Sequence, residues 1–257
     1  MNSKTKLKLK PIIDILMTFA LLLLMSYELL GSTAHEVVGV AMFVLFVVHH
    51  ALNINWAKHL TKGRQPPIRI FQNILVLLVL ISFVGSIVSG VIVSRHLFAF
   101  LNIKLTYAAN RIHMLSAYWG FIFMSLHLGL HFNMILLMIK KKKQLSPKVK
   151  TAFKIIFILI FAYGIYALFK RDIASYLFLK NQFFLLGDNE HLLLYLFDYM
   201  SIMFSFATLS HFVFSILNSS GGNYGIVAVK NVAEPPEVFL NSLIATYSTE
   251  AKAIKAM

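Results

Sequence analysis

The feature that most constrains this chain is a series of six apolar segments, each about long enough for a helix to cross a membrane. A helix spans the hydrocarbon core with roughly 20 consecutive apolar residues, and only one segment, with 18 residues, falls short of that length. The segments cover residues 11–30, 34–55, 68–93, 112–138, 152–169 and 192–217. The sequence therefore predicts an all-α integral membrane protein with six transmembrane helices.

Composition supports this class of protein and excludes every kind of site that needs cysteine. Hydrophobic residues make up 58% of the 257 positions and charged residues only 13%, which is far too apolar for a soluble domain of this length. The chain has no cysteine, so disulfides, thiolate-held clusters, c-type haem links and cysteine zinc sites are excluded. Any metal chemistry must use histidine, carboxylate or a bound cofactor.

The basic residues are distributed unevenly between the two sides that the six segments define. With the N-terminus in the cytoplasm, 18 of the 24 Lys and Arg residues fall in cytoplasmic segments. The positive-inside rule therefore predicts an even number of helices with both termini cytoplasmic. The basic run 140–143 is interpreted as facing anionic lipid, not nucleic acid, and residues 218–257 are predicted to form a cytoplasmic tail.

Histidines recur at the same spacing in two of the apolar segments. His35 and His49 are fourteen residues apart, and His113 and His127 repeat that spacing. At about 100° per residue, fourteen steps end about 40° short of four turns, so the two histidines of a pair lie on one face of their helix. They are about 21 Å apart along the helix axis. Ionisable side chains inside a membrane are costly and usually functional.

Residues 35–56 and 113–134 match when they are laid over each other, and the match pairs His49, not its neighbour His50, with His127. The second and fourth helices run parallel under the predicted topology. His35 and His113 are therefore expected at the outer membrane level, and His49 with His127 at the inner level. We predict a cytochrome-b-like four-helix haem bundle in residues 1–139, two further transmembrane helices in 140–217, and the tail in 218–257.

The four matched histidines have the chemistry of haem ligands. Neutral imidazole is an axial ligand of haem iron, and two imidazoles leave no open position on the metal, which favours electron transfer over oxygen chemistry. The sequence therefore predicts two haems b with His35, His49, His113 and His127 as the iron ligands. A quinone is a further candidate cofactor.

Four other residues are secondary candidates for cofactor binding. His131 could hydrogen-bond a haem propionate, assist a quinone or substitute as a ligand. His50 fits a packed neighbour or a proton path, and His211 could meet His50 or His131 if its helix packs on the bundle. Arg111, at the outer level, could neutralise a haem propionate, although ordinary interface charge explains it more simply.

Two further features leave alternatives open. Gly85, Ser86, Ser89 and Gly90 in the third helix would allow either close helix packing or room for a flat ligand. Asp198 and Glu28 lie in or near apolar helices, where each could serve a proton path or a quinone, or pair with a neighbouring helix.

The histidine spacing on two parallel helices resembles that of membrane b-type cytochromes. The His35-Glu36 opening, Gly39, and the stretch from His49 to Trp56 more closely resemble the bacterial flavinylation-associated cytochromes. That resemblance implies haem b at the matching histidines, a place in the bacterial inner membrane, and an extracytosolic flavin-bearing or iron-reducing electron carrier as partner. It covers the first four helices well and the last two only loosely. Met114 stands where the second unit would repeat Glu36.

These observations predict transmembrane electron transfer through two bis-histidine haems b. The protein would link a cytoplasmic-side donor or quinol pool to the extracytosolic carrier, as a cytochrome b or as the membrane subunit of an oxidoreductase. One alternative is a transporter whose histidines bind a transition metal or carry protons, which should have carboxylates beside the histidines and helices broken near the midplane. Another is a structural subunit that anchors a larger redox complex.

Overall fold

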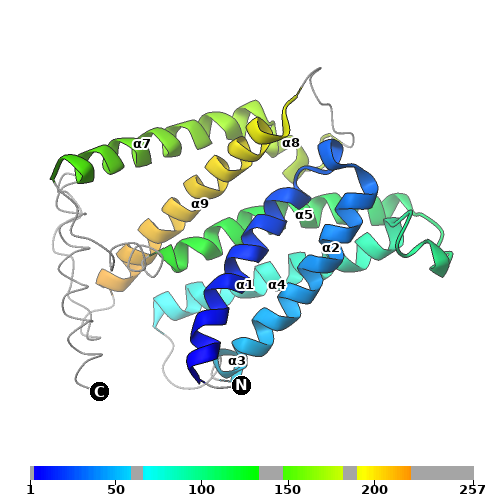
Figure 1. Ribbon diagram of the computed structural model, residues 1–257, viewed down its shortest axis with the longest axis horizontal. Helices are drawn as coiled ribbons and strands as arrows, with labels where there is room; N and C mark the ends of the chain where they lie inside the picture. The colour runs from blue at the N-terminus through cyan, green and yellow to red at the C-terminus, as the bar shows by residue number, and fades with distance from the viewer. Residues whose placement is uncertain (1–2, 59–65, 133–146, 182–189, 221–257) are drawn as a thin grey trace.

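The computed structural model describes residues 3–58, 66–132, 147–181 and 190–220, and in these ranges the regular structure is entirely helical (Figure 1). Six helices are long: α1 (Ser3–Leu24), α2 (Tyr27–Leu52), α4 (Pro67–Val93), α5 (Tyr107–Leu130), α7 (Pro147–Lys170) and α9 (Leu192–Ser220). The short elements are α3 (Ile54–Lys58), the 3₁₀ turn η1 (Ala99–Leu101) and α8 (Ile173–Leu177). The prediction of an all-α chain is confirmed for the described residues.

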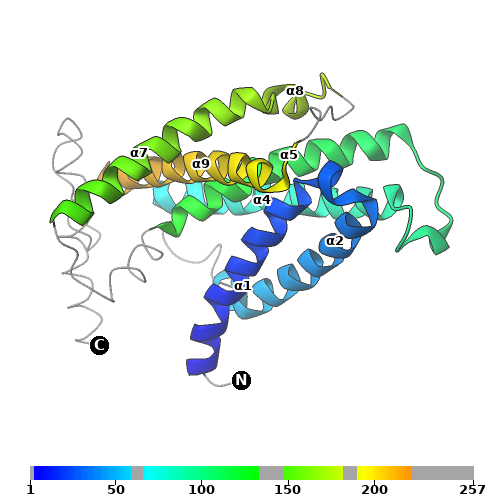
Figure 2. The ribbon, with the colours of Figure 1, turned by 45° about the horizontal axis from the view of Figure 1, so that its top comes forward.

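The long helices pack as three neighbouring pairs. α1 lies against α2, α4 against α5, and α7 against α9, while α5 also packs along α9 (Figures 1 and 2). The indole of Trp119 on α5 donates a 3.0 Å hydrogen bond to the carbonyl of Leu177 and so fixes α8 to the same helix. α5 is therefore the helix that joins the matched-histidine region to the last two long helices.

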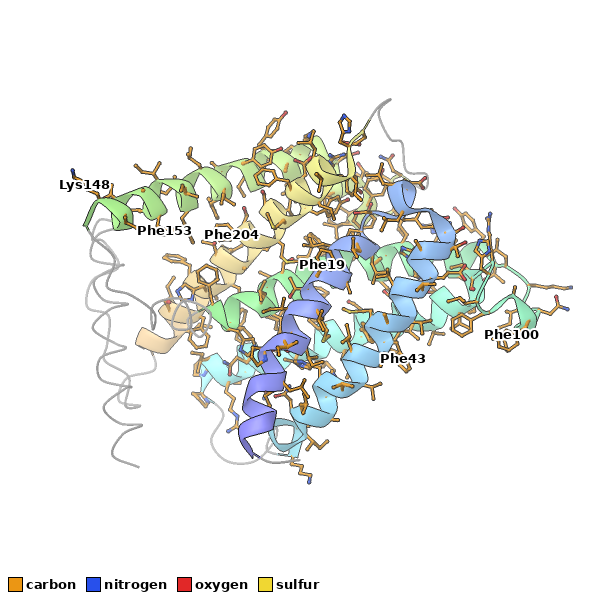
Figure 3. The ribbon with its side chains drawn as sticks, in the orientation of Figure 1. Phe19, Phe43, Phe100, Lys148, Phe153 and Phe204 are labelled. Atoms are coloured by element: carbon orange, nitrogen blue, oxygen red, sulfur yellow. The ribbon has the colours of Figure 1, made fainter. Side chains whose placement is uncertain are left out.

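The distribution of side chains is that of a protein surrounded by lipid. Large apolar side chains such as Phe19, Phe43 and Phe153 are exposed on the outside of α1, α2 and α7 (Figure 3). Small polar side chains are buried between helices instead, namely Ser26, Ser82, Ser89, Ser125, Ser201, Ser205 and Ser210. Small residues at helix interfaces and apolar residues outside are typical of membrane helices.

Four helical segments in the described ranges are long and apolar enough to cross a membrane: Tyr27–Leu52, Pro67–Val93, Thr151–Lys170 and Leu192–Leu217. These correspond to four of the six predicted transmembrane helices. α1 and α5 are long helices as predicted but are not among these four candidates.

The predicted end of the first helix, residue 30, was wrong, whereas the break in the helix at Gly31 lies close to the predicted start of the second helix at residue 34. The first helix ends at Leu24, and the second begins at Tyr27 and is kinked at Gly31, whose φ of 78° suits glycine. The apolar pattern continues through this turn, so hydropathy cannot locate it. Tertiary contacts help to hold the turn, because the Tyr195 hydroxyl donates a 3.0 Å hydrogen bond to the carbonyl of Met25.

The other boundaries agree more closely. α4 begins with Pro67 in its first turn, where the missing N–H costs nothing. α5 begins at Tyr107, earlier than the predicted residue 112, because Thr106 caps it by accepting a hydrogen bond from the Ala109 N–H. Several predictions lie outside the described residues: the end of that helix at 133–138, the basic run 140–143 and the tail from residue 221.

Two glycines allow α9 to approach its neighbours closely. A Cβ added to Gly129 of α5 would collide with the Ala207 carbonyl, and one added to Gly164 of α7 would collide with the Ser201 carbonyl. Both obstacles are backbone atoms of α9, which cannot turn aside as a flexible side chain can. The two glycines therefore set the spacing of the α5, α7 and α9 group.

Gly129→Ala is expected to destabilise the protein by about 1–3 kcal/mol, because overpacking a tight contact forces the backbone to shift. The thermal unfolding midpoint in detergent measures this loss. Gly39→Ala is the matched control, since its added Cβ would lie 3.9 Å from Leu24 Cδ2, in ordinary contact. Both changes add one methyl group to a helical glycine, so equal midpoints for the two variants would contradict the prediction.

Candidate functional site

The structure brings His35 of α2 and His113 of α5 together. Their ring centroids are 6.1 Å apart, with the ring planes at 75°. Tyr27 also lies edge-on to the His35 ring, with the centroids at 5.2 Å. Each helix thus contributes one histidine, and we call His35 and His113 the outer pair.

A third helix, α4, orients His113. Nδ1 of His113 lies 3.0 Å from the Ser86 carbonyl oxygen and 3.2 Å from Ser89 Oγ. A carbonyl only accepts, so Nδ1 carries the proton and Nε2 keeps the lone pair that a metal would use. Gly90 makes room for the ring, because a Cβ there would lie 3.3 Å from His113 Cε1.

The other two matched histidines occupy a second cluster, which we call the inner pair. Nδ1 of His49 is 2.8 Å from Oδ1 of Asp14 on α1. His127 of α5 interacts electrostatically with both His49 and Asp14. His131 packs edge-on against His127, with the ring centroids 5.1 Å apart.

Two ring nitrogens of these pairs are left without a partner in the described part of the chain. Nδ1 of His35 and Nδ1 of His127 are both buried and make no hydrogen bond of good geometry there, although the Leu24 carbonyl lies near the His35 ring. Leaving a buried polar atom unsatisfied costs about 1–3 kcal/mol. Such atoms mark positions where a bound group would be stabilised.

The secondary candidates have more ordinary surroundings. The exposed His50 donates from Nδ1 to the Phe46 carbonyl at 2.9 Å, as a packed neighbour would. His211 is buried on α9, with its ring 5.5 Å from that of Phe132. Arg111 donates a 3.0 Å hydrogen bond to the Tyr107 hydroxyl. The fourth, His131, belongs to the inner cluster.

Glu36, next to His35, accepts hydrogen bonds from the loop that follows α4. Its carboxylate accepts hydrogen bonds from the Ser94 hydroxyl at 2.8 Å and from the N–H groups of Arg95 at 2.8 Å and Leu97 at 2.7 Å. The N–H of His96 contacts it as well. The carboxylate therefore fastens this loop to α2, beside the outer pair.

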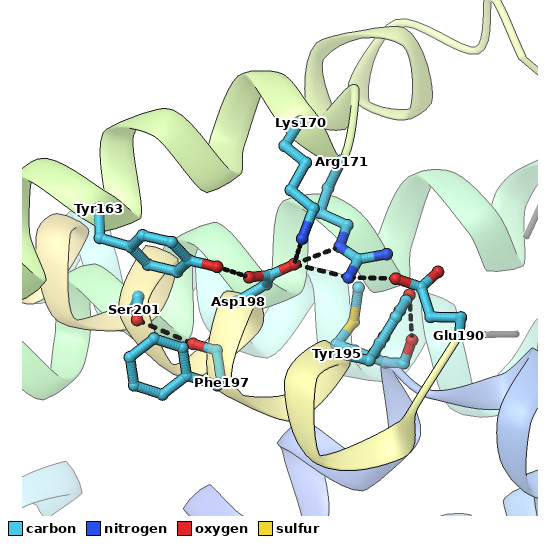
Figure 4. A network of polar contacts seen from close by, with 9 residues as sticks. Tyr163, Lys170, Arg171, Glu190, Tyr195, Phe197, Asp198 and Ser201 are labelled. Atoms are coloured by element: carbon cyan, nitrogen blue, oxygen red, sulfur yellow. Dashed lines mark hydrogen bonds and ion pairs between the residues drawn. The ribbon is translucent and has the colours of Figure 1, made fainter. Parts of the chain in front are cut away.

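Asp198 pairs with neighbouring helix residues, one of its predicted alternatives (Figure 4). Its fully buried carboxylate accepts hydrogen bonds from Lys170 Nζ at 2.8 Å, Arg171 Nε at 2.8 Å and the Tyr163 hydroxyl. Arg171 Nη2 lies 2.6 Å from the same carboxylate as an ion-pair contact. Burial alone lowers the pKa of Arg171, but its bonds to Glu190 and Asp198 raise that pKa above its ordinary value, so the guanidinium stays charged.

The small residues of α4 serve helix packing where the contacts are tightest. A Cβ on Gly85 would collide with Ser116 Oγ, and one on Gly120 of α5 would lie 3.3 Å from Ser82 Cβ. Close packing is therefore the role of Gly85. Gly90 leaves room for the His113 ring, and room for a flat ligand stays a prediction.

The four helices of the predicted haem bundle are present, but α2 packs mainly on α1 and does not approach α4 or α5 as closely as it approaches α1. Side chains bridge the separation, as in the stacked rings of Phe46 on α2 and Phe83 on α4, 3.9 Å apart. Among the described residues, no group of three or more His, Asp or Glu could hold a metal ion. Haem binding between these helices stays a prediction.

Sequence reasoning missed Asp14 as a partner of His49. A signal was available, because Asp14 is an acidic residue within an apolar helical segment, and such residues are functional candidates by default. The contact joins residues 35 positions apart on two helices, so no local pattern predicts it. The partners of Asp198 were missed for the same reason.

Fold and side-chain distribution together define a multi-pass membrane protein with four candidate spans. Comparisons with protein-family models, curated proteins and solved structures give no match for this chain.

Proposed function

We propose that this protein carries electrons across the bacterial inner membrane through two haems b, one held by His35 and His113 and the other by His49 and His127. In this proposal the chain crosses the membrane six times, with α1 and α5 as the two additional spans and both termini in the cytoplasm. The observation that carries the proposal is the outer pair, in which two helices bring their matched imidazoles to one point.

The spacing of the outer pair suits a single metal between the two rings. Two metal–nitrogen bonds of about 2 Å each, plus the part of each ring between its nitrogen and its centroid, add up to about 6 Å. The centroids are 6.1 Å apart. The chain has no cysteine to attach haem covalently, so the haem would be bound without a thioether link, and the resemblance to b-type cytochromes makes haem b the expected cofactor.

The residues around both pairs also suit ligand histidines. A metal-binding histidine usually donates its other ring N–H to a carbonyl or carboxylate, which orients the ring. Ser86 supplies the carbonyl for His113, and Asp14 supplies the carboxylate for His49. Haem iron with two imidazoles supplies one-electron oxidation and reduction without an open site for oxygen.

The partners follow from the resemblance and from the topology of the proposal. The electron carrier on the outer side would bear a flavin or reduce iron, and a cytoplasmic-side donor or quinol would act at the inner pair. His131, exposed next to His127, is the histidine best placed to meet a quinone there.

The alternative of a metal or proton transporter has one observation in its favour, the carboxylate of Asp14 beside His49. It also calls for broken helices near the midplane. The kink in α2 falls at Gly31, near the start of the helix. Haem content separates the two functions directly.

The purified full-length protein is expected to contain about two haems b per chain, as bis-histidine sites in two pairs require. A reduced-minus-oxidised optical spectrum with pyridine-haem quantitation measures this number. The spectrum should be that of a low-spin, six-coordinate iron. A folded protein that is produced with ample haem and yet contains none would overturn the proposal and favour the transporter.

A further inference from the structure

The two histidine pairs differ in the charge that contacts their rings. His49 is bonded through Nδ1 to a carboxylate, at 2.8 Å from Asp14. His113 is bonded through Nδ1 to neutral oxygens, the Ser86 carbonyl and the Ser89 hydroxyl. Nδ1 of His35 and of His127 makes no hydrogen bond within the described ranges. Only the inner pair, among these contacts, has an anion on a ring.

The outer pair has a carboxylate nearby, but that carboxylate is engaged elsewhere. Glu36 accepts from the Ser94 hydroxyl and from three consecutive backbone N–H groups. These donors compensate its charge and tie it to the loop. Asp14, in contrast, places its Oδ1 directly on the imidazole of His49, and its side chain is 43% exposed.

An ionised carboxylate can only accept a hydrogen bond, so it requires Nδ1 of His49 to carry the proton. The proton is drawn toward the carboxylate, which leaves more electron density on Nε2 and makes the imidazole a stronger ligand base. A stronger base favours the more positively charged, oxidised state of a bound metal. The neutral partners of His113 have this effect to a smaller degree.

We propose that Asp14 is a positioning residue for His49, which fixes the tautomer of that ring and makes the inner position the weaker electron acceptor of the two. This inference rests on the proposed function, because it concerns the ligands of a haem. It makes the two sites unequal by a feature of α1, a helix that contributes none of the four histidines. An electron shared between the two positions then favours the outer one.

Redox titration of Asp14→Asn, followed optically, tests the inference. Asparagine keeps the shape of the side chain and removes its charge. The lower of the two midpoint potentials is expected to shift upward and the higher one to stay in place, with haem content unchanged. His127→Ala and His113→Ala assign the shift: Asp14→Asn should move the potential that survives in His113→Ala and leave the one that survives in His127→Ala.

A second measurement on the unmutated protein keeps the test decisive if Asp14→Asn folds poorly. In the reduced protein labelled with ¹⁵N-histidine, His49 should show a protonated Nδ1 with a strongly hydrogen-bonded proton, identified by its loss in His49→Ala. An unprotonated Nδ1 would overturn the inference, as would a folded Asp14→Asn protein with both potentials unmoved. A wild-type protein without haem would instead refute the proposed function, and the inference with it.

Discussion

His113→Ala is expected to lower the haem content from about two to about one haem per chain, and His35→Ala is expected to cause the same loss. The two residues lie together, with ring centroids 6.1 Å apart. Either change therefore removes one of the two proposed ligands of a single haem. Pyridine-haem quantitation of the purified variants measures the loss. His49→Ala and His127→Ala should each remove the other haem.

Double variants make the pairing testable. His35→Ala combined with His113→Ala should lose no more haem than either single change, because both act on one site. His35→Ala combined with His49→Ala should lose both haems. If the double variant of the outer pair contained less haem than its singles, the two residues would belong to different sites and the cross-helix pairing would be wrong.

His50→Ala is the matched control, since His50 is the immediate neighbour of His49 and is exposed, with Nδ1 bonded to the Phe46 carbonyl of its own helix. The change should leave both haems in place. Loss of the inner haem in His50→Ala, with none in His49→Ala, would mean that the register of the internal repeat is shifted by one residue.

Much of the helical architecture was predictable because apolar length is a local property. The six segments correspond to six long helices, and Pro67 lies at the start of α4 where the pattern begins. The turn at Met25 and Ser26 was not predictable, since it lies within a continuous apolar run. A contact from Tyr195, 170 residues away, helps to hold it.

The proximity of His35 and His113 agrees with the pairing predicted from the histidine spacing and the internal repeat, whereas the membrane levels of the two pairs and their haem ligation stay predictions. The residues that orient the histidines were less accessible to prediction. Asp14 reaches His49 from another helix, and Ser86 acts on His113 through its backbone carbonyl. Every residue has a backbone carbonyl, so the residue type does not indicate which carbonyl will accept a hydrogen bond from His113.

Asp198→Ala is expected to destabilise the protein by about 3–5 kcal/mol, because removing one partner of a buried ion network leaves the opposite charge without compensation. Asp198 is fully buried on α9. Its carboxylate holds Lys170, Arg171 and Tyr163 of the α7 end together (Figure 4). The change would therefore loosen the packing of α7 and α9 where the end of α7 meets the start of α9.

The size of the stability loss in Asp198→Ala depends on whether Lys170 or Arg171 can reach water. Lys170 is 37% exposed and can turn outward, whereas the Arg171 side chain is only 8% exposed and stacks on the Tyr195 ring at 4.4 Å. Arg171 would keep Glu190, 2.5 Å away, as its remaining carboxylate partner. The loss should therefore lie toward the lower end of the range if Glu190 compensates fully.

Thermal unfolding in detergent, compared with Asp172→Asn, measures this effect. Asp172 is exposed, and its carboxylate accepts hydrogen bonds from the Ser175 hydroxyl and the Asn181 side-chain amide. Replacement of this surface residue should change stability by no more than about 0.5 kcal/mol. Asp198→Ala combined with Arg171→Gln should cost less than the sum of the two single changes, because each removes the same contact. Additive losses would mean that the Asp198–Arg171 ion pair drawn in Figure 4 contributes nothing to stability.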